Sequence, residues 1–323
     1  MSWVLVGEMK GRLEQFLDQH PWWVVIVWGG TATGKTSLSV ALADSFDLGV
    51  VSADSRQIFR FMDIGTDKIS SELREKIPHF QIDIVNPDQL YTAGQWKSDS
   101  ELIIDGLLKR QKVPFVVGGT WLYLDTLYKN FLLADVASDE EFRKKLFEEE
   151  FVNPGILYQR LSLIDPQEAE KLHPHSIRYI IRALEIFEKT GKMKSFFVQR
   201  RKPRRPLLMV WLWRSKEDAN VRIDRRVKEM LAGGLIEETQ WLLDQWYDRG
   251  LQSMQGIGYK QCVAFLLDHG DRGRLEDEIC QSTHYLAKKQ RTWFRRYIAD
   301  GEQGFEGVEY EVYDLGWLSV MYF

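Results

Sequence analysis

Continuous apolar runs mark the buried strands of this chain. They lie at residues 23–28, 50–53, 114–117 and 207–213, with a weaker run at 80–84. Strands buried on both faces read as unbroken apolar runs, whereas half-exposed strands alternate between apolar and polar residues. The pattern therefore predicts a central, mostly parallel sheet with both faces covered.

Helical patterns separate these runs. Residues 10–20 have the spacing of a short amphipathic helix, and Thr92 and Gln95 form a capping box that opens another. Strands that alternate with helices indicate an α/β fold, here a P-loop NTPase-like parallel sheet with helices on both faces. The apolar stripe of the helix after Thr92 includes Trp96, Ile103 and Leu107.

From residue 135 the alternation stops and helices follow one another. Ser138 and Glu141 form a second capping box, Asp165 caps a helix that begins with a proline, and residues 176–189 are strongly helical with Gly191 beyond them. The next apolar strand run begins only at residue 207. We expect three parts: the first part of the α/β core at 1–134, an all-helical insertion at 135–205, and core completion with C-terminal helices at 206–323.

The last part of the chain is helical and rich in cations. Helices are predicted over 218–231 and 276–298, and a basic run covers 199–205. Charged helix faces and basic runs are usually only solvated. Two basic features in an acidic chain nevertheless favour contact with RNA or another phosphate-bearing ligand. Helical spacing places Ile279, Leu286, Trp293 and Tyr297 on one side of the long helix and His284, Lys288, Arg291 and Arg295 on the other.

Composition places the chain among globular proteins and limits its partners. With 323 residues, 44% of them hydrophobic, the chain can bury a large core. A net charge of -4 restricts any nucleic-acid surface to a local patch. Cys262 and Cys280 have neither metal-ligand spacing nor a disulfide framework. The sequence shows no secretory signal and no apolar run of transmembrane length, so we expect a cytoplasmic protein without a membrane partner.

The segment at 29–36 is the most specific chemical signal. It reads G-G-T-A-T-G-K-T and lies between an apolar strand run and a helical pattern, the context that a phosphate-binding loop requires. Its glycines let backbone N–H groups converge on an anion, and the helix N-terminus adds its dipole. The loop predicts a diphosphate or triphosphate site and leaves the reaction open. Its residues are Gly29, Gly30, Thr31, Ala32, Thr33, Gly34, Lys35, which supplies a point charge, and Thr36, whose hydroxyl is placed to bind Mg²⁺.

Asp54 and Thr120 also follow predicted strands directly. In open parallel sheets, ligands bind outside the carboxyl ends of the strands. The phosphate loop, Asp54 and Thr120 should therefore lie along one edge of the sheet, around one diphosphate.

At this point the sequence resembles a known family, the tRNA dimethylallyltransferases or isopentenyltransferases. A phosphate loop alone is weakly specific, but these stretches in this order are highly specific, and they cover nearly the whole chain. Where Trp121 replaces a usual glycine of the family, the site is expected to be narrower. The matching stretches are G-G-T-A-T-G-K-T at 29–36, S-A-D-S-R-Q at 52–57, M-D-I-G-T at 62–66, G-G-T-W-L-Y at 118–123, R-A-L-E at 182–185, I-G-Y-K at 257–260 and K-Q-R-T-W-F-R at 289–295.

The resemblance implies a reaction and a role for each matching residue. The family moves a dimethylallyl group from its diphosphate to N6 of an adenosine next to the anticodon of tRNA. Asp54 resembles the general base, with a Walker-B-like Mg²⁺ ligand as the competing interpretation. Thr120 is similar to a group that contacts the diphosphate or the amine, or it only caps the following helix. Lys35 and the loop hold the leaving diphosphate with Mg²⁺ on Thr36, and Arg222 is a candidate second contact.

The resemblance also implies a tRNA surface. An adenine in a stacked anticodon loop must be flipped out before its amine can react. The family's RNA contacts map onto Asp54, Ser55, Arg56, Gln57, Thr120, Arg143, Arg178 and Arg182, and the late basic helix adds Lys288 and Arg295.

Three other interpretations stay open from the sequence. A P-loop small-molecule kinase would share the length and the sheet, but it would need no basic helical insertion. An adenylate dimethylallyltransferase, which makes a free cytokinin, would share the chemistry but not the tRNA surface. A non-enzymatic RNA-binding protein with a vestigial loop fits poorly with Lys35, Thr36 and Asp54. We expect the chain to act as a monomer.

Overall fold

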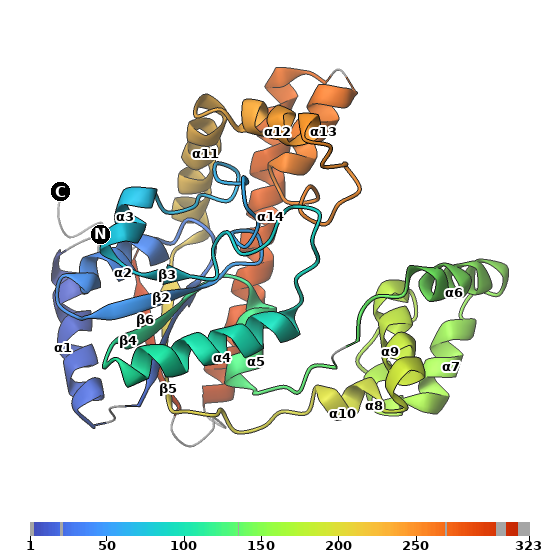
Figure 1. Cartoon of the computed structure of the whole chain (residues 1–323), viewed down its shortest axis with the longest axis horizontal. Helices are drawn as coiled ribbons and strands as arrows, with labels where there is room; N and C mark the ends of the chain where they lie inside the picture. Colours follow the sequence, from blue (N-terminus) through green and yellow to red (C-terminus); the bar gives the residue numbers. More distant parts are fainter. Residues whose placement is uncertain (1–2, 20–21, 135, 269, 302–307, 316–323) are drawn as a thin grey trace. The chain divides into compact units, whose positions relative to one another are not determined.

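The computed structural model describes residues 3–19, 22–134, 136–268, 270–301 and 308–315. A six-stranded sheet forms its centre, with the strand order β3-β2-β4-β1-β5-β6 and every neighbouring pair parallel (Figure 1). This confirms the predicted α/β fold. The strands are β1 (Val24–Gly29), β2 (Leu48–Ala53), β3 (His79–Phe80), β4 (Val113–Gly118), β5 (Leu207–Trp213) and β6 (Val308–Asp314).

The chain forms two compact units. The first combines Met1–Leu124 with Pro203–Phe323, and the second is Asp125–Lys202. The helices of the chain are α1 (Trp3–Gln19), α2 (Lys35–Ala43), α3 (Ser71–Lys76), α4 (Ala93–Lys109), α5 (Trp121–Tyr128), α6 (Glu140–Val152), α7 (Ile156–Ile164), α8 (Pro166–Ala169), α9 (Ile177–Thr190), α10 (Lys194–Phe197), α11 (Lys216–Ala232), α12 (Leu235–Asp244), α13 (Tyr259–Leu267) and α14 (Arg272–Gly301). Among the described residues, none of these helices has the length and apolar character needed to cross a membrane.

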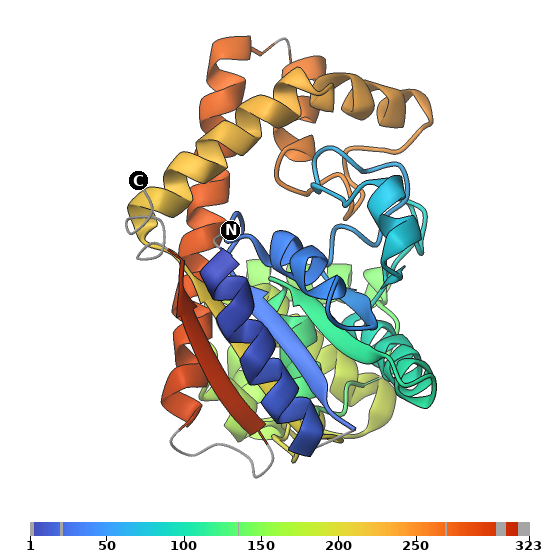
Figure 2. The ribbon, with the colours of Figure 1, turned by 90° about the vertical axis from the view of Figure 1, so that its left-hand side faces the viewer.

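Helices α1 and α2 cover one face of the sheet (Figure 2). Met9, Leu13 and Phe16 of α1 are buried against alternate residues of the strands, such as Val25 and Val210. The helix predicted at 10–20 therefore exists, although it begins earlier, at Trp3, and His20 lies outside the described residues.

Helices α4 and α14 contact the sheet itself, and aromatic side chains fix both of them. Trp96 of α4 is fully buried, and its Nε1 donates to the Ser52 carbonyl at 3.0 Å. Trp28 of β1 stacks on Trp211 of β5 and meets the edge of Phe294 of α14. These aromatic contacts pack α14 against β1, the strand that leads into the phosphate loop.

Several local predictions were wrong by small offsets. Strand β3 ends at Phe80 rather than Ile84, because Gln81 and Asp83 have positive φ values and the Asp83 carboxylate turns to Lys68 and Arg74. The capping box at Thr92 is confirmed, but Ile104 rather than Ile103 is buried on α4. Helix α6 is capped by Asp139, whose side chain accepts the Phe142 N–H, and not by Ser138.

The second unit holds α6 to α10 around its own apolar cluster, which includes Leu146, Leu157 and Ile180. Helix α8 begins with Pro166 behind the Asp165 cap, and α9 ends at Gly191 in the left-handed conformation, as predicted. The unit spans Asp125–Lys202, whereas the expected insertion was 135–205.

A further apolar cluster joins α11, α12, α13 and α14 to the loop after β2. Ile58 and Met62 of that loop are buried among Ile223, Tyr259 and Ile279. Helices α11 and α14 lie side by side (Figure 2). The cluster therefore brings helices from the last third of the chain to the carboxyl edge of the sheet, next to the loop after β2.

Candidate active site at the carboxyl edge of the sheet

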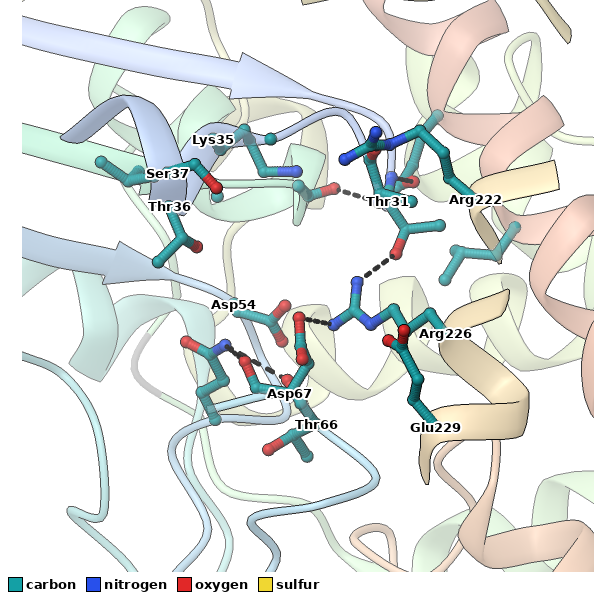
Figure 3. Close-up of a pocket in the computed structure, with 18 of the residues that line it drawn as sticks. Thr31, Lys35, Thr36, Ser37, Asp54, Thr66, Asp67, Arg222, Arg226 and Glu229 are labelled. Carbon is teal, nitrogen blue, oxygen red and sulfur yellow. Dashed lines mark hydrogen bonds and ion pairs between the residues drawn. The ribbon is translucent and has the colours of Figure 1, made fainter. Parts of the chain in front are cut away.

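A cleft of about 290 Å³ lies at the carboxyl edge of the sheet. It is lined by residues from the phosphate loop, the loop after β2, the end of β4, and helices α11 and α14 (Figure 3). The structure thus brings the loop and Asp54 together at one edge, as the sequence predicts. The lining residues used below are Thr31, Ala32, Gly34, Lys35, Thr36, Asp54, Gln57, Asp67, Gly119, Arg222, Arg226 and Gln290.

The phosphate loop closes tightly between β1 and α2. Gly34 caps α2 with φ of 95°, a conformation that favours glycine. At Gly29 a Cβ would lie 2.6 Å from the Leu212 carbonyl, so only glycine lets β5 approach. The Lys35 amine donates to the carbonyls of Gly29 and Gly30 at 3.1 and 2.8 Å.

Lys35 is the cation nearest the loop carbonyls. Burial lowers the pKa of Lys35 to about 8; the charge of Arg226 also lowers it, whereas Asp54 and Asp67 raise it. An anion bound in the loop would raise this pKa again by favouring the charged amine, so this amine is suited to a diphosphate.

Two oxygen donors face the cleft beside the loop, the Thr36 hydroxyl and the Asp54 carboxylate (Figure 3). Oxygen ligands suit Mg²⁺, which is commonly held by one or two protein groups together with phosphate oxygens and waters. In the described part of the chain, no group of three or more His, Cys, Asp or Glu side chains could hold a metal alone. The residues present therefore fit a Mg²⁺ ion that arrives with a phosphate ligand.

Asp54 is held by the loop that follows β2. Its Oδ1 accepts the Arg56 N–H at 2.8 Å, and the Arg56 guanidinium donates to the Gln252 carbonyl at 2.6 Å. The Gln57 amide accepts from Ser52 at 2.9 Å and donates to the Thr66 carbonyl at 3.2 Å. Arg56 and Gln57 thus shape the loop that presents Asp54.

Thr120 follows β4 and contacts the Asp54 loop rather than the cleft. Its hydroxyl oxygen accepts the Ser55 N–H at 3.0 Å and lies 3.3 Å from the Ser55 hydroxyl. A Cβ at Gly118 would lie 2.2 Å from the Ala53 carbonyl, so β2 and β4 end in close contact. Trp121 does not line the cleft; its ring lies 5.6 Å from that of Trp293, so the expected narrowing by Trp121 is not found.

Helix α11 brings two arginines to the loop. Arg222 donates from Nε to the Ala32 carbonyl at 3.0 Å, which places this predicted residue in the cleft. Arg226 donates to the Thr31 hydroxyl at 3.2 Å and forms an ion pair with Asp67. Neither Arg226 nor Asp67 was predicted as a site residue, although the four-residue spacing from Arg222 places Arg226 on the same helix face.

Helix α14 contributes Gln290, which was also not predicted as a site residue. Its side chain is 6% exposed and contacts both the phosphate loop and Gly119. The sequence did carry one signal for a role of Gln290: it is a polar residue on the apolar side of the helix, four residues from both Leu286 and Phe294. The buried face is also offset from the predicted one, because Phe294 is fully buried while Trp293 is half-buried, and the side chain of Tyr297 lies outside the described residues.

The opposite side of α14 is only partly a free basic ridge. Lys288 and Arg295 are exposed. His284 lies 2.8 Å from Asp224, and Arg291 is half-buried, which lowers the pKa of its guanidinium. Lys288 and Arg295 are therefore the residues of the ridge whose charges are exposed to solvent.

The predicted RNA residues of the second unit divide into two kinds. Arg178 is exposed, and it has no hydrogen-bond or ion-pair partner among the described residues. Arg143 and Arg182 instead hold the fully buried Glu185, Arg143 with two bonds of 2.9 Å and Arg182 with one of 2.5 Å. Burial raises the pKa of Glu185, but the hydrogen bonds from Arg143, the Asp139 N–H and Arg182 bring it below the usual value.

The basic run at 199–205 is also largely paired. Arg204 and Arg205 both contact Glu101 and Asp105 of α4. Arg200 donates to the Tyr128 hydroxyl at 3.0 Å. Arg204 and Arg205 are thus paired where the chain enters β5, rather than simply solvated as such runs usually are.

Two family models match this chain. The model described as IPP transferase matches residues 57–297, and the model described as isopentenyl transferase matches residues 23–76, which include the phosphate loop. The chain belongs to the IPP transferase family. Asp54 falls in the second match, Asp67 falls in both, and Arg222, Arg226 and Gln290 fall in the first.

Curated relatives in the IPP transferase family are named tRNA dimethylallyltransferase. One from Thermotoga neapolitana is 40% identical over 274 residues, which are 85% of this chain and 90% of the relative. Another from Pelotomaculum thermopropionicum is 41% identical over 276 residues, with 85% and 88% covered. The match thus spans most of both proteins.

Solved IPP transferase structures share the fold. The full-length tRNA isopentenylpyrophosphate transferase from Bacillus halodurans matches with a TM-score of 0.62 and 33% identity, over 90% of each chain. A eukaryotic dimethylallyltransferase acting on tRNA matches with a TM-score of 0.78 and 29% identity, over 92% of this chain and 75% of that one. These matches confirm the predicted fold class.

Proposed function

We propose that this chain transfers a dimethylallyl group from dimethylallyl diphosphate to N6 of the adenosine adjacent to the anticodon in tRNA, with release of diphosphate. The naming of its relatives as tRNA dimethylallyltransferases supports the activity. The observation that carries the proposal is a single cleft lined by both the phosphate loop and Asp54.

The phosphate loop is the proposed holder of the leaving group. Breaking an allylic C–O bond builds negative charge on the diphosphate, and fixed donors that face this charge lower the barrier. Lys35 and the loop N–H groups supply such donors. Arg222 and Arg226, which line the same cleft from α11, supply two further cations.

Asp54 is the proposed general base. The N6 amine of adenine is a poor nucleophile because its lone pair is delocalised into the ring, so it must lose a proton as the new C–N bond forms. The carboxylate lines the cleft with the loop, and its own loop is fixed by the Arg56 N–H and by Thr120. The proton moves from N6 to Asp54 while the electron pair of the breaking C–O bond leaves with the diphosphate.

Mg²⁺ is the proposed cofactor, held by Thr36 with the diphosphate oxygens. When bound, the ion would neutralise charge on the leaving diphosphate. Asp54 is another side chain of the cleft that could contribute an oxygen to the ion, and this role competes with its role as the base.

The exposed cations Arg178, Lys288 and Arg295 are the proposed contacts to tRNA phosphates. Such contacts fix a nucleic acid in register without reading its sequence. We also propose that the chain acts as a monomer, in the cytoplasm.

One experiment separates this proposal from its alternatives. The protein is incubated with Mg²⁺, dimethylallyl diphosphate and either an anticodon stem-loop or AMP, and the products are analysed by mass spectrometry. The proposal predicts a prenylated stem-loop and unchanged AMP. Prenylated AMP would establish the adenylate transferase instead. No transfer to either acceptor, combined with phosphate transfer from ATP, would establish the kinase.

A further inference from the structure

One buried glutamine joins two loops of the candidate active site. Gln290 lies on α14, and its Oε1 accepts the Thr31 N–H of the phosphate loop at 3.0 Å. Its Nε2 donates to the Gly119 carbonyl, in the turn after β4, at 2.9 Å. The two bonds use opposite ends of one amide group, so the side chain spans the space between the loops.

The chemistry of the two partners fixes the orientation of this amide. Thr31 offers a donor and Gly119 an acceptor, so only one placement of the glutamine oxygen and nitrogen satisfies both. Neither a glutamate nor a methionine of similar length can do the same, because the first has no donor when ionised and the second has neither group. The position therefore requires a neutral amide of this length.

The fit is close as well as specific. A Cβ added to Gly119 would lie 2.6 Å from Gln290 Nε2 and 3.3 Å from the Gly29 carbonyl. The turn at Gly119 can thus meet Gln290 only because it carries no side chain. The same turn continues into Thr120, whose hydroxyl holds the Ser55 N–H next to Asp54.

These contacts form a continuous connection. The phosphate loop is bonded to Gln290, Gln290 to Gly119, and Thr120 to the loop of Asp54. In group transfer, the leaving group and the proton acceptor must be held at a fixed separation, and a displacement of about 1 Å can cost about 10²-fold in rate. We propose that Gln290 is a positioning residue that sets the separation between the phosphate loop and the Asp54 edge of the cleft.

The inference rests on the proposed function, because it assigns the loop to the leaving group and Asp54 to the base. It also predicts which kinetic constant changes. The Thr31 N–H is already bonded to Gln290, so the remaining loop N–H groups, Lys35 and the arginines are the groups left for the diphosphate. Loss of Gln290 should therefore reduce kcat more than it weakens donor binding.

The test compares Gln290→Met and Gln290→Glu with Gln281→Met, an exposed glutamine on the same helix. We expect Gln290→Met to lower kcat about 10- to 100-fold, with the donor KM changed less than about threefold. Gln290→Met should keep the binding of Mg²⁺ and inorganic diphosphate, measured by calorimetry, and still lose kcat. Gln290→Glu retains the acceptor for Thr31 and loses the bond to Gly119, but it also adds a negative charge to the cleft, so it should lose kcat and bind diphosphate more weakly. Gln281→Met should match the wild type.

A double-mutant cycle separates positioning from a general loss of structure. Gly119→Ala should lower kcat in the wild type by displacing the amide, and it should cost much less when combined with Gln290→Ala, which removes the clashing group. Additive losses, a kcat within twofold of the wild type for Gln290→Met, or a loss confined to the donor KM would each overturn the inference. All rates are measured with whichever acceptor, stem-loop or AMP, the wild type prenylates. If it prenylates neither, the proposed function fails at that step, and weaker diphosphate binding by the uncharged variant Gln290→Met would still overturn the role of Gln290.

Discussion

Arg226 of α11 is ion-paired with Asp67, and both side chains line the cleft into which the phosphate loop opens (Figure 3). The carboxylate is thus the partner of a cation that the proposed mechanism assigns to the diphosphate. It also adds negative charge where a negatively charged ligand must bind, although more than half of the Asp67 side chain is exposed.

Replacing Asp67 should therefore tighten donor binding. Asp67→Asn removes the repulsion and frees Arg226, so the KM for dimethylallyl diphosphate should fall about threefold, a modest change because solvent screens an exposed charge. Arg226→Ala should raise the same KM. Steady-state kinetics at pH 7 give both values. The exposed Asp88→Asn, outside the cleft, is the matched control, and a higher KM for Asp67→Asn would show that the pair instead holds the cleft in shape.

The pKa of Lys35 makes donor binding dependent on pH. Burial lowers this pKa to about 8, so the free enzyme loses the charge on Lys35 as the pH rises through that value. A bound diphosphate favours the charged form. The donor KM should therefore be flat below pH 7 and rise above pH 8, by at most about tenfold per pH unit. A KM that stays constant to pH 9.5 would contradict a charged Lys35 at the leaving group.

Removing the Lys35 amine tests the same site directly. Lys35→Ala should lower turnover by about 10²-fold or more, the scale on which losing one donor to a developing anion acts. Lys35→Arg keeps a charge and should lose less. Single-turnover rates measure the effect, and near-wild-type rates for the alanine variant would contradict the assignment.

Glu185 should govern the stability of the second unit. Its carboxylate is fully buried between Arg143 and Arg182, which are about 30% exposed. Removing the partners of a buried charge is strongly destabilising, so Arg143→Ala combined with Arg182→Ala should cost about 3–5 kcal/mol. Urea unfolding measures this loss. Arg178→Ala should leave the unfolding midpoint unchanged, and an unchanged midpoint for the double variant would show that Glu185 needs neither arginine.

The exposed cations of both units should govern tRNA binding. Replacing Arg178, or Lys288 together with Arg295, by alanine should raise the tRNA KM and flatten its dependence on salt. The reason is that tRNA binding releases fewer counterions when fewer phosphates are contacted. The donor KM should change little. Lys109→Ala with Arg110→Ala, two exposed cations at the C-terminal end of α4, is the control. If the salt dependence is the same in all these variants, tRNA binds elsewhere.

Local signals predicted β1 to β5, the phosphate loop and the position of Asp54, because each depends on residues adjacent in the chain. Strand β6 was missed, because Val308–Asp314 mixes apolar and acidic residues instead of forming an apolar run. Predicted boundaries were offset where neighbouring residues can both cap a helix, as Ser138 and Asp139 can. They were also offset where ion pairs with other segments determine the backbone conformation, as Lys68 and Arg74 do at Asp83. The cleft's long-range pairs were not predictable in this way. Gln290 was missed because its partners, Thr31 and Gly119, lie 259 and 171 residues before it in the chain.

The central claim is that Asp54 takes the proton from the adenine amine. Asp54→Asn keeps the shape of the side chain and removes the proton acceptor, so kcat should fall by about 10²–10⁴ while donor affinity and the Mg²⁺ requirement stay nearly unchanged. The decisive measurement is a Mg²⁺ titration of the transfer rate of Asp54→Asn. We predict that the rate stays low and saturates at the wild-type Mg²⁺ concentration, whereas a rate that recovers at high Mg²⁺ would make Asp54 a metal ligand and contradict its role as the base.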